Sequence, residues 1–215
     1  MSIRRIITGA LVAGFVAATA VMSPAVAAPT TGVIAGKLTT SSGAPAAGIP
    51  VTVDDAETAR PWYTTTDTAG RWSLRVPPGS SYVVSFVDGS YRQYSPQVLE
   101  FADATRHTVR AGRTERIRES LLEAASLTGR LTDAAGAPVG NARVSLLTSY
   151  AFELWTTTDA DGGYRFDKLA PGAVKISFHL ADGRVQWAHQ KPSWDEADEI
   201  VLTLGGTATV DDQLL

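Results

Sequence analysis

Apolar and polar residues alternate along most of the chain after residue 30, in short stretches separated by turn residues. In RWSLRV, which begins at Arg71, every second residue is apolar: Trp72, Leu74 and Val76. Alternation of this kind places the apolar set on one face of a β-strand. The pattern predicts strands at 33–40, 49–55, 62–67, 71–76, 81–88, 105–110 and 114–122. We find no long helical period there, so the sequence predicts an all-β fold.

Turn residues close the predicted hairpins. The stretches DTAG, from Asp67, and DADG, from Asp159, place Asp first and Gly fourth, the preference of a type I turn. Proline precedes glycine at 78–79 and again at 171–172, as a type II turn prefers. Seven short strands with turns at this spacing predict a β-sandwich. One exception is the S-x-x-E pattern from Ser193 to Glu196, which predicts a single helical turn.

The chain contains the same pattern twice. GKLTTSSGAP begins at Gly36 and GRLTDAAGAP at Gly129, a separation of 129 − 36 = 93 residues. SYVVSF is matched later by VKISF, and RESLL by DDQLL, so the similarity runs the whole length of each half. We therefore predict two tandem seven-stranded Greek-key-type β-sandwiches, at 28–122 and 127–215. The link between them reaches at most ~14 Å, which predicts an end-to-end arrangement.

The N-terminal segment has the features of a signal peptide. Arg4 and Arg5 precede an uncharged apolar run at 6–21, and Ala25-Val26-Ala27 has the small-x-small pattern of a cleavage site. A transmembrane anchor is the alternative, but the run is shorter than the ~20 apolar residues that a spanning helix needs. The sequence thus predicts a signal at 1–27, cleavage between Ala27 and Ala28, and a secreted protein. The general secretory route is favoured, and the arginine pair leaves the twin-arginine route open.

Composition narrows the choice of partners. The chain has no cysteine, so no disulfide supports either sandwich and each needs its own apolar core. Without the signal, Lys and Arg number 17 and Asp and Glu 22, a net charge of 17 − 22 = −5. This sign argues against nucleic acid and against an anionic membrane surface, and the linear sequence shows no Lys/Arg cluster. We expect a monomer with no membrane attachment after signal removal.

The order of turn and core residues resembles the carboxypeptidase regulatory-like domain family, in the form found in secreted actinobacterial proteins. In the first half the match is carried by Gly36, Leu38, Thr39, Gly43, Pro45, Val51, Asp67, Gly70, Trp72, Leu74, Pro78, Gly79, Tyr82, Val84 and Phe86. In the second half it is carried by Gly129, Leu131, Pro138, Val144, Asp159, Gly162, Tyr164, Phe166, Pro171, Gly172 and Phe178. The resemblance implies a seven-stranded sandwich of the transthyretin-like, carbohydrate-binding-like fold. Matched positions of these types specify a fold and not a ligand.

The family's sandwiches also occur beside catalytic domains, in secreted carboxypeptidases and in starch-degrading enzymes. An amylase-type barrel needs upwards of ~200 residues, which two sandwiches do not leave. His107, His179 and His189 are scattered and none begins a His-x-x-Glu pair. Asp159-x-Asp161-Gly162 resembles part of a calcium loop, but we favour a plain turn. We therefore expect no catalytic residues, no metal site and no cofactor.

Aromatic residues near strand ends and loops carry the remaining functional signal. Trp72 and Tyr164 alternate with core residues, and we expect them to be buried. Seven other rings lie beside polar residues: Trp62, Tyr63, Tyr91, Tyr94, Trp155, Trp187 and Trp194. Flat rings next to polar groups are typical of carbohydrate binding.

The favoured function is therefore weak binding of a polysaccharide or cell-surface glycan. The alternative is a passive structural or adhesive spacer whose rings close the ends of the sandwiches or the junction between them. A more distant possibility is an accessory part of a starch-degrading or carboxypeptidase system. Exposure of the rings discriminates the first two, because a coplanar exposed pair would favour binding.

The signal-peptide assignment predicts the N-terminus of the exported protein. N-terminal sequencing of material from the culture medium should begin at Ala28, or within a residue or two of it, because the cleavage pattern ends at Ala27. A full-length product that stays with the membrane would contradict the extracellular assignment.

Overall fold

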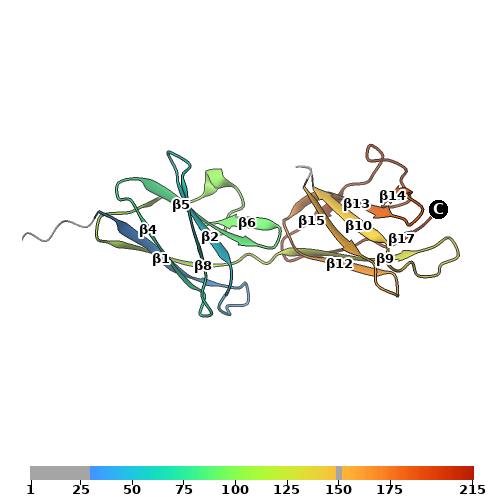
Figure 1. Cartoon of the computed structure of the whole chain (residues 1–215), viewed down its shortest axis with the longest axis horizontal. Coiled ribbons are helices and arrows are strands. Elements are labelled where there is room, and N and C mark those ends of the chain that lie inside the picture. Colours follow the sequence, from blue (N-terminus) through green and yellow to red (C-terminus); the bar gives the residue numbers. More distant parts are fainter. Residues whose placement is uncertain (1–29, 149–151) are drawn as a thin grey trace, which may run out of the picture.

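The chain folds into two β-sandwiches that lie end to end (Figure 1). The computed structural model describes residues 30–148 and 152–215, so the predicted signal peptide lies outside the described residues. The prediction of an all-β tandem of sandwiches is confirmed. In the described part of the chain the helical content is one short 3₁₀ turn, η1 (Phe101–Asp103).

The first copy is a single sandwich built from two sheets. The smaller sheet has the order β4 (Arg71–Val76), β1 (Gly32–Thr39), β8 (Thr114–Ser120). The larger sheet has the order β3 (Pro61–Thr65), β2 (Pro50–Asp55), β5 (Ser81–Asp88), β6 (Tyr91–Tyr94), and β7 (His107–Thr108) also pairs with β5. Pairing is antiparallel except between β1 and β8, the first and last strands, which run parallel.

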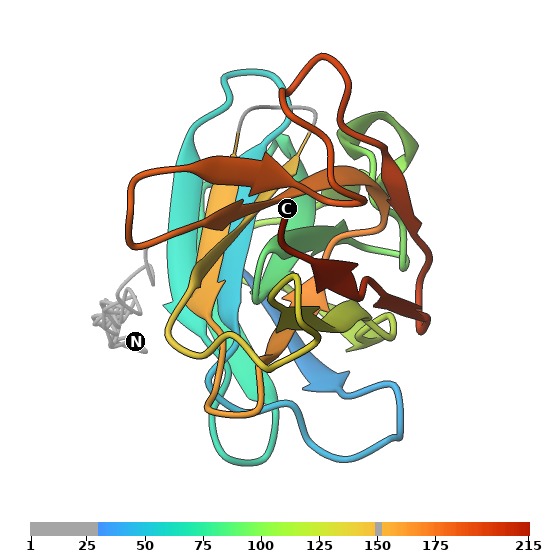
Figure 2. The same cartoon turned by 90° about the vertical axis from the view of Figure 1, so that its right-hand side faces the viewer.

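The second copy repeats this topology. Its smaller sheet has the order β12 (Gly163–Leu169), β9 (Ala125–Thr132), β16 (Thr207–Thr209), with β17 (Asp212–Gln213) also on β9. Its larger sheet has the order β11 (Glu153–Thr157), β10 (Arg143–Thr148), β13 (Gly172–His179), β14 (Val185–Trp187), with β15 (Ile200–Leu202) on β13. Figure 2 looks along the long axis and shows the two copies in similar orientations.

Each copy has a separate hydrophobic core between its two sheets. Ile34, Val53 and Phe86 are among the buried residues of the first core, and none of its members belongs to the second. Trp72 and Tyr164 are buried as predicted, and each packs edge-to-face against a phenylalanine of the opposite sheet. Burial of aromatic rings of this size accounts for much of the stability of small sandwiches without disulfides.

The strand β6 and its counterpart β14 were not predicted from the sequence. β6 has only four residues, and one of its two inward side chains is Gln93, which is completely buried. A polar residue on the inward side removes the apolar alternation on which a strand prediction depends. The predicted helical turn from Ser193 to Glu196 is a non-helical turn, whereas the corresponding loop of the first copy contains η1.

Gln93 holds the end of β8 in place. Its side-chain Nε2 donates to the Ser120 carbonyl at 2.8 Å, and its Oε1 accepts from the Leu122 backbone N–H at 2.6 Å. Gln186 does the same in the second copy, where it donates to the Gln213 carbonyl and accepts from the Leu215 N–H. A buried amide that satisfies two backbone groups explains why a polar residue occupies this inward position.

The two copies touch at a hairpin tip. The backbone N–H of Ser90, in the β5–β6 turn, donates to the Lys168 carbonyl at 3.0 Å, and the Ala170 N–H donates to the Ser90 hydroxyl at 3.2 Å. Lys168 Nζ also lies 2.7 Å from an Asp88 carboxylate oxygen. Both copies form hydrogen bonds to the link 121–124. On the side of the first copy Gln93 accepts from the Leu122 N–H, and on the side of the second copy the Gly205 N–H donates to the Glu123 carbonyl. These contacts fix the junction and agree with the predicted end-to-end arrangement.

A β-bulge in the second copy creates the contact with Ser90. From Trp72 to Val76 the first copy has 76 − 72 = 4 steps, whereas from Tyr164 to Leu169 the second has 169 − 164 = 5. The extra residue lies where the β12–β9 register shifts, and Lys168 there has a positive φ of 54°. A bulge bends its strand and redirects its backbone groups. The insertion therefore presents the Lys168 carbonyl to the preceding copy.

Replacing Gln93 tests the anchoring of β8. Gln93→Ala should lower the free energy of unfolding by about 2–5 kcal/mol, because the Ser120 carbonyl and the Leu122 N–H lose their buried partner. Gln97→Ala is a matched control, since the exposed Gln97 also donates to Ser120, and it should change the stability by no more than about 0.5 kcal/mol. Urea unfolding of both variants measures the difference, and equal losses would contradict the assigned role.

Replacing Gly89 tests the junction. Gly89 has a φ of 65°, and a Cβ there would lie 2.3 Å from the Lys168 Cβ, so Gly89→Val should force the copies apart. Gly183→Val places the same strain in the equivalent hairpin of the second copy, where a Cβ meets nothing within 4 Å. Residual dipolar couplings should fit one alignment tensor for the parent and for Gly183→Val, and two for Gly89→Val. A single tensor for all three would contradict the contact.

Candidate functional site

A row of four side chains crosses the larger sheet of the second copy. Trp155 pairs with Ser145, Ser145 with Ser177, and Ser177 with Trp187. Directly paired residues share one face of a sheet, and the residues that alternate with the serines, such as Leu146 and Phe178, are in the core. The row is therefore on the outer face. Its two tryptophans are three strand spacings apart, or about 14 Å.

The first copy has an equivalent row. Tyr63 pairs with Thr52, Thr52 with Ser85, and Ser85 with Tyr94. Each row thus consists of two aromatic residues with two hydroxyl residues between them. The sheets that carry the rows lie on the same side of the long axis in both views (Figures 1 and 2). We call this outer surface the aromatic face of each copy.

Exposure of the row residues is uneven. Tyr63 and Trp155, on the edge strands β3 and β11, are 71% and 63% exposed. Tyr94 and Trp187, at the other end of each row, are half-buried. The hydroxyl residues between them are buried beneath their neighbours, so they form the floor of the face. The outermost rings are therefore the parts of the row most accessible to a ligand.

A second ring packs against the half-buried end of each row. Trp194 lies edge-to-face on Trp187, with ring centroids 5.3 Å apart, and Phe101 lies on Tyr94 in the same way at 5.8 Å. Both outer rings are about two-fifths exposed, and Lys175 Nζ is 4.5 Å from the centre of Trp194. The rings of each pair are nearly perpendicular, so they do not form a coplanar platform. Phe101 was not predicted, although its separation from Trp194 is again 93 residues.

Charged side chains surround the floor of the second row. The Ser145 hydroxyl donates to Glu153 Oε1 at 2.6 Å, and Arg143 donates to the same oxygen at 2.8 Å. The hydrogen bond from Ser145, followed by Arg143, lowers the pKa of Glu153, which keeps this carboxylate ionised. The Arg143 guanidinium also lies 5.3 Å from the centre of the Trp155 ring. Trp155 therefore has a hydrogen-bond acceptor and a donor beside its exposed ring.

The first row has its own polar group. The Arg92 guanidinium donates to the Ser85 hydroxyl at 2.9 Å and remains exposed at the surface. In the second row the corresponding serine, Ser177, lies 3.2 Å from His179 Nε2. Both floors thus combine a hydroxyl with a longer polar side chain that has further hydrogen-bonding capacity.

Two of the seven aromatic residues singled out from the sequence do not belong to the aromatic face. Tyr91 is 3% exposed, and its hydroxyl donates to the Leu122 carbonyl at 2.7 Å. Burial, with a smaller effect from Asp88, raises the pKa of Tyr91 to about 12. Trp62 packs from the inner side of β3 edge-to-face on Tyr82, at 5.7 Å. For these two rings the alternative interpretation, closure of the core, describes their position.

The Asp159 stretch forms a turn. Its carboxylate accepts the backbone N–H groups of Asp161 and Gly163, at 2.9 and 2.8 Å, and the same arrangement occurs at Asp67. Within residues 30–148 and 152–215 there is no group of three or more His, Asp or Glu placed to hold a metal ion. The prediction that these turns close hairpins is wrong, because the Asp67 turn joins β3 to β4 and the Asp159 turn joins β11 to β12, and each of these pairs of strands lies in two different sheets. Asp159 therefore stabilises a turn by which the chain passes from the larger sheet to the smaller one.

Comparison with protein families matches both copies. The model of the carboxypeptidase regulatory-like domain matches residues 33–121 and again residues 126–214. The chain belongs to the carboxypeptidase regulatory-like domain family. The resemblance read from the turn and core residues is thereby confirmed. The family match covers the strands that carry both aromatic faces, although it does not identify a ligand for them.

Several solved structures align with most of this chain. The minor pilin GBS52 of Streptococcus agalactiae aligns over 85% of this chain and 94% of its own, with a TM-score of 0.50 and 10% identity. The shaft pilin SpaA of Lactobacillus rhamnosus GG aligns over 86% and 98%, with a TM-score of 0.41 and 9% identity. The TIE protein of Bacillus anthracis, 18% identical with a TM-score of 0.36, aligns over 86% of this chain, which spans 34% of its length. No curated protein matches the chain.

The family match and the similar structures identify no ligand and no reaction for either copy. The family description names a regulatory-like domain and not the carboxypeptidase itself, and the three structure titles mention no catalytic activity. Among the residues that the structure describes, none lies in a helix long and apolar enough to cross a membrane. At 10% identity the minor pilin shows a similar fold and nothing about function.

Proposed function

We propose that this protein is a secreted, non-catalytic binding protein that attaches to a polysaccharide or cell-surface glycan through its aromatic faces. The observation that supports the proposal is the repeated row of ring, hydroxyl, hydroxyl and ring, which both copies place on the outer side of the same sheet. Core packing does not require an exposed aromatic residue, and Tyr63 and Trp155 each expose more than half of their surface.

The chemistry of each row suits a sugar. An exposed ring stacks on the apolar face of a pyranose, while polar groups beside it bond to the hydroxyls. In the second copy Glu153 accepts and Arg143 donates beside Trp155, and in the first copy Arg92 donates beside Ser85. Because each edge-to-face pair offers one ring, the rows provide separate contacts about 14 Å apart. Such isolated contacts favour weak binding to an extended chain of sugars.

The junction between the copies favours binding to a polymer. Ser90 and Lys168 hold the two sandwiches together, so the two aromatic faces keep a nearly fixed separation. A polymer with repeated units can contact both faces at once, and the second contact then occurs at a high effective concentration. The affinity of the tandem for a polymer can therefore exceed the affinity of either copy alone.

A passive structural or adhesive spacer is the second candidate. It is supported by the same clamped junction, which makes the tandem stiff, and by the fold that it shares with the minor pilin. A spacer needs stiffness but does not need an exposed ring at the same position of the outer face in both copies, as Tyr63 and Trp155 provide. We therefore place the glycan-binding role first.

Removing the rings that end the rows tests the proposal. Tyr63→Ala with Tyr94→Ala in the first copy, and Trp155→Ala with Trp187→Ala in the second, should each weaken retention on an insoluble polysaccharide selected by glycan array. The quadruple variant should lose about tenfold or more, since each stacked ring contributes roughly 0.5–1.5 kcal/mol. Trp62→Phe is the control, because Trp62 packs on the inner side of β3.

Two outcomes would favour the spacer. One is a parent protein that binds no glycan on the array. The other is a quadruple variant that keeps its thermal transition and binds as the parent does. Circular dichroism of each variant verifies that the sandwiches remain folded, so a loss of retention can be assigned to the missing rings.

A further inference from the structure

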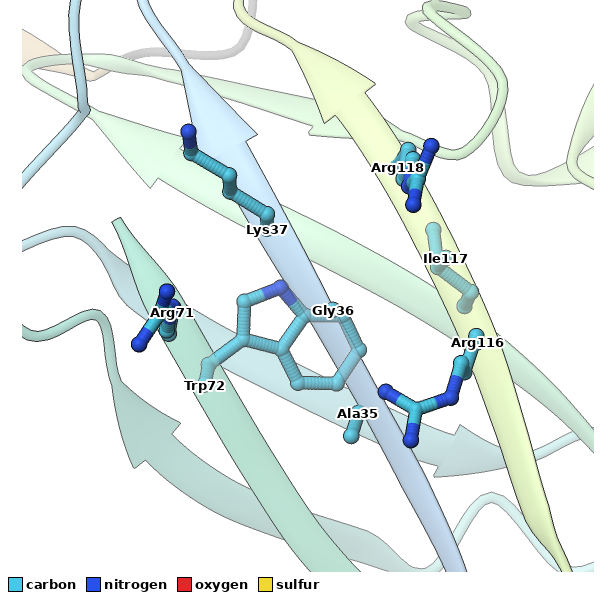
Figure 3. Close-up of a pocket in the computed structure, with 8 residues that line it drawn as sticks. All are labelled: Ala35, Gly36, Lys37, Arg71, Trp72, Arg116, Ile117 and Arg118. Atoms are coloured by element: carbon cyan, nitrogen blue, oxygen red, sulfur yellow. The ribbon is translucent and has the colours of Figure 1, made fainter. Parts of the chain in front are cut away.

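The smaller sheet of the first copy has a strongly basic outer surface, which we call the basic face. It consists of five exposed side chains on three adjacent strands: Lys37 on β1, Arg71 and Arg75 on β4, and Arg116 and Arg118 on β8. Lys37 pairs with Arg71 on one side and with Arg118 on the other, so three cations cross the sheet in one row. Figure 3 shows four of the five around Gly36.

From the linear sequence we expected no Lys/Arg cluster, and the structure shows that this expectation was wrong. The five cations are distributed between residues 37 and 118, and strand pairing brings them together. Alternate residues of the same strands, such as Trp72 and Ile117, are buried in the core. Burial of these apolar residues therefore forces the cations onto the outer side.

The basic face has no acidic partner. Among the ion pairs that residues 30–148 and 152–215 form, none includes any of the five cations, and the remaining residues of the chain contain no Asp or Glu. Glu115 and Glu119 alternate with the arginines along β8, so their side chains project from the opposite side of the strand. Glu115 accordingly lies 3.4 Å from His107. Five unpaired cations at strand spacing repel one another, which an anionic ligand would relieve.

The surface between the cations is open. Ala35 supplies only a methyl group there, and four of the cations, Lys37, Arg71, Arg116 and Arg118, line a groove of about 800 Å³. Across the row the cations lie one strand spacing apart, about 4.8 Å, and Arg116 and Arg118 are about 7 Å apart along β8. The charges therefore line an open groove and not an enclosed pocket, which fits an extended ligand with repeated negative groups.

The second copy provides an internal comparison. At the equivalent face Arg165 forms an ion pair with Asp167, and the Asp211 carboxylate accepts the backbone N–H of Arg130. Residues 33–121 contain ten Lys and Arg and nine Asp and Glu (10 − 9 = +1), whereas residues 126–214 contain seven and twelve (7 − 12 = −5). The fold therefore does not require a basic face. Among the two copies, the first has this face and the second does not.

We propose that the basic face binds an anionic polysaccharide, one whose sugars carry carboxylate or sulfate groups. Guanidinium groups bind such groups through paired hydrogen bonds, and four of the five cations are arginine. The face lies on the opposite side of the sandwich from the aromatic row of the same copy, because the two sheets turn their inner sides to one core. The proposal therefore does not depend on glycan binding by the aromatic faces.

Two other polyanions fit the face less well. Binding of single-stranded nucleic acid uses aromatic rings on which bases stack, and the aromatic residue of these three strands, Trp72, points into the core. Attachment to an anionic membrane uses exposed large apolar side chains next to the cations. No such side chain occurs on β1, β4 or β8, which all lie within the described residues. Both polyanions remain as arms of the test.

The test compares charge removal in the two copies. One variant carries glutamine at four positions of the basic face: Lys37, Arg71, Arg116 and Arg118. Its control removes the same charge from the second copy, with glutamine at Arg130, Arg165, Arg184 and Lys191. Binding of the mature protein to polygalacturonate and to dextran sulfate is measured in low salt, with neutral dextran as a blank. The first variant should bind about tenfold more weakly or worse, and the control less than about threefold more weakly.

Salt dependence and the other polyanions complete the test. The parent's affinity should fall as NaCl rises, and the first variant should show a shallower dependence. The four-glutamine variant of the first copy should keep the parent's retention on the neutral polysaccharide that the aromatic faces are proposed to bind, which separates this proposal from the function of those faces. Absence of polyanion binding by the parent, equal losses in both charge variants, or tighter binding to single-stranded DNA or to phosphatidylglycerol vesicles would overturn the proposal.

Discussion

The register of strand pairing determines every surface of this molecule that can carry function. A shift of one residue in a half-buried strand would exchange its core side for its solvent side, so burial of one apolar face leaves a single acceptable pairing. In the larger sheet, burial of Leu146 opposite Ile176 leaves Ser145 and Ser177 outside, between two tryptophans. In the smaller sheet, burial of Trp72 and Ile117 leaves the arginines of β4 and β8 outside. The core therefore arranges both the aromatic faces and the basic face.

Duplication gave two copies with one topology and different surfaces. Both retain the aromatic rows and the buried glutamine that anchors the last strand, Gln93 or Gln186. The first copy alone has a cluster of five cations without ion pairs on its smaller sheet, and the second alone has the bulge at Lys168 that contacts the hairpin tip before it. A single inserted residue thus converts two linked sandwiches into a clamped pair, while substitutions on the outer sides leave both cores intact.

The sequence predicted the parts of the fold that depend on local patterns. Alternation in RWSLRV and the Asp-to-Gly turns identified strands and the turns between them because each signal lies within a few neighbouring residues. A turn signal does not say which strands pair, and the turns predicted to close hairpins join strands of different sheets. It did not reveal β6, where the buried Gln93 interrupts the alternation, nor the basic face, whose members lie up to 81 residues apart (118 − 37 = 81). The aromatic residues were visible as candidates, but only strand pairing distinguishes the exposed Trp155 from the core-facing Trp62 and the buried Tyr91. Phe101 was missed because its partner ring, Tyr94, is apparent only in three dimensions.

If the protein binds a glycan as proposed, the sugar contacts the aromatic faces and not the core rings. The chain has five tryptophans, and each gives its own indole N–H resonance in a nitrogen-15 correlation spectrum. Titration with a neutral oligosaccharide selected by glycan array tests the claim most directly. The account predicts shifts for Trp155, Trp187 and Trp194, with Trp62 and Trp72 unchanged. Absence of any shift, or shifts confined to Trp62 and Trp72, would contradict it.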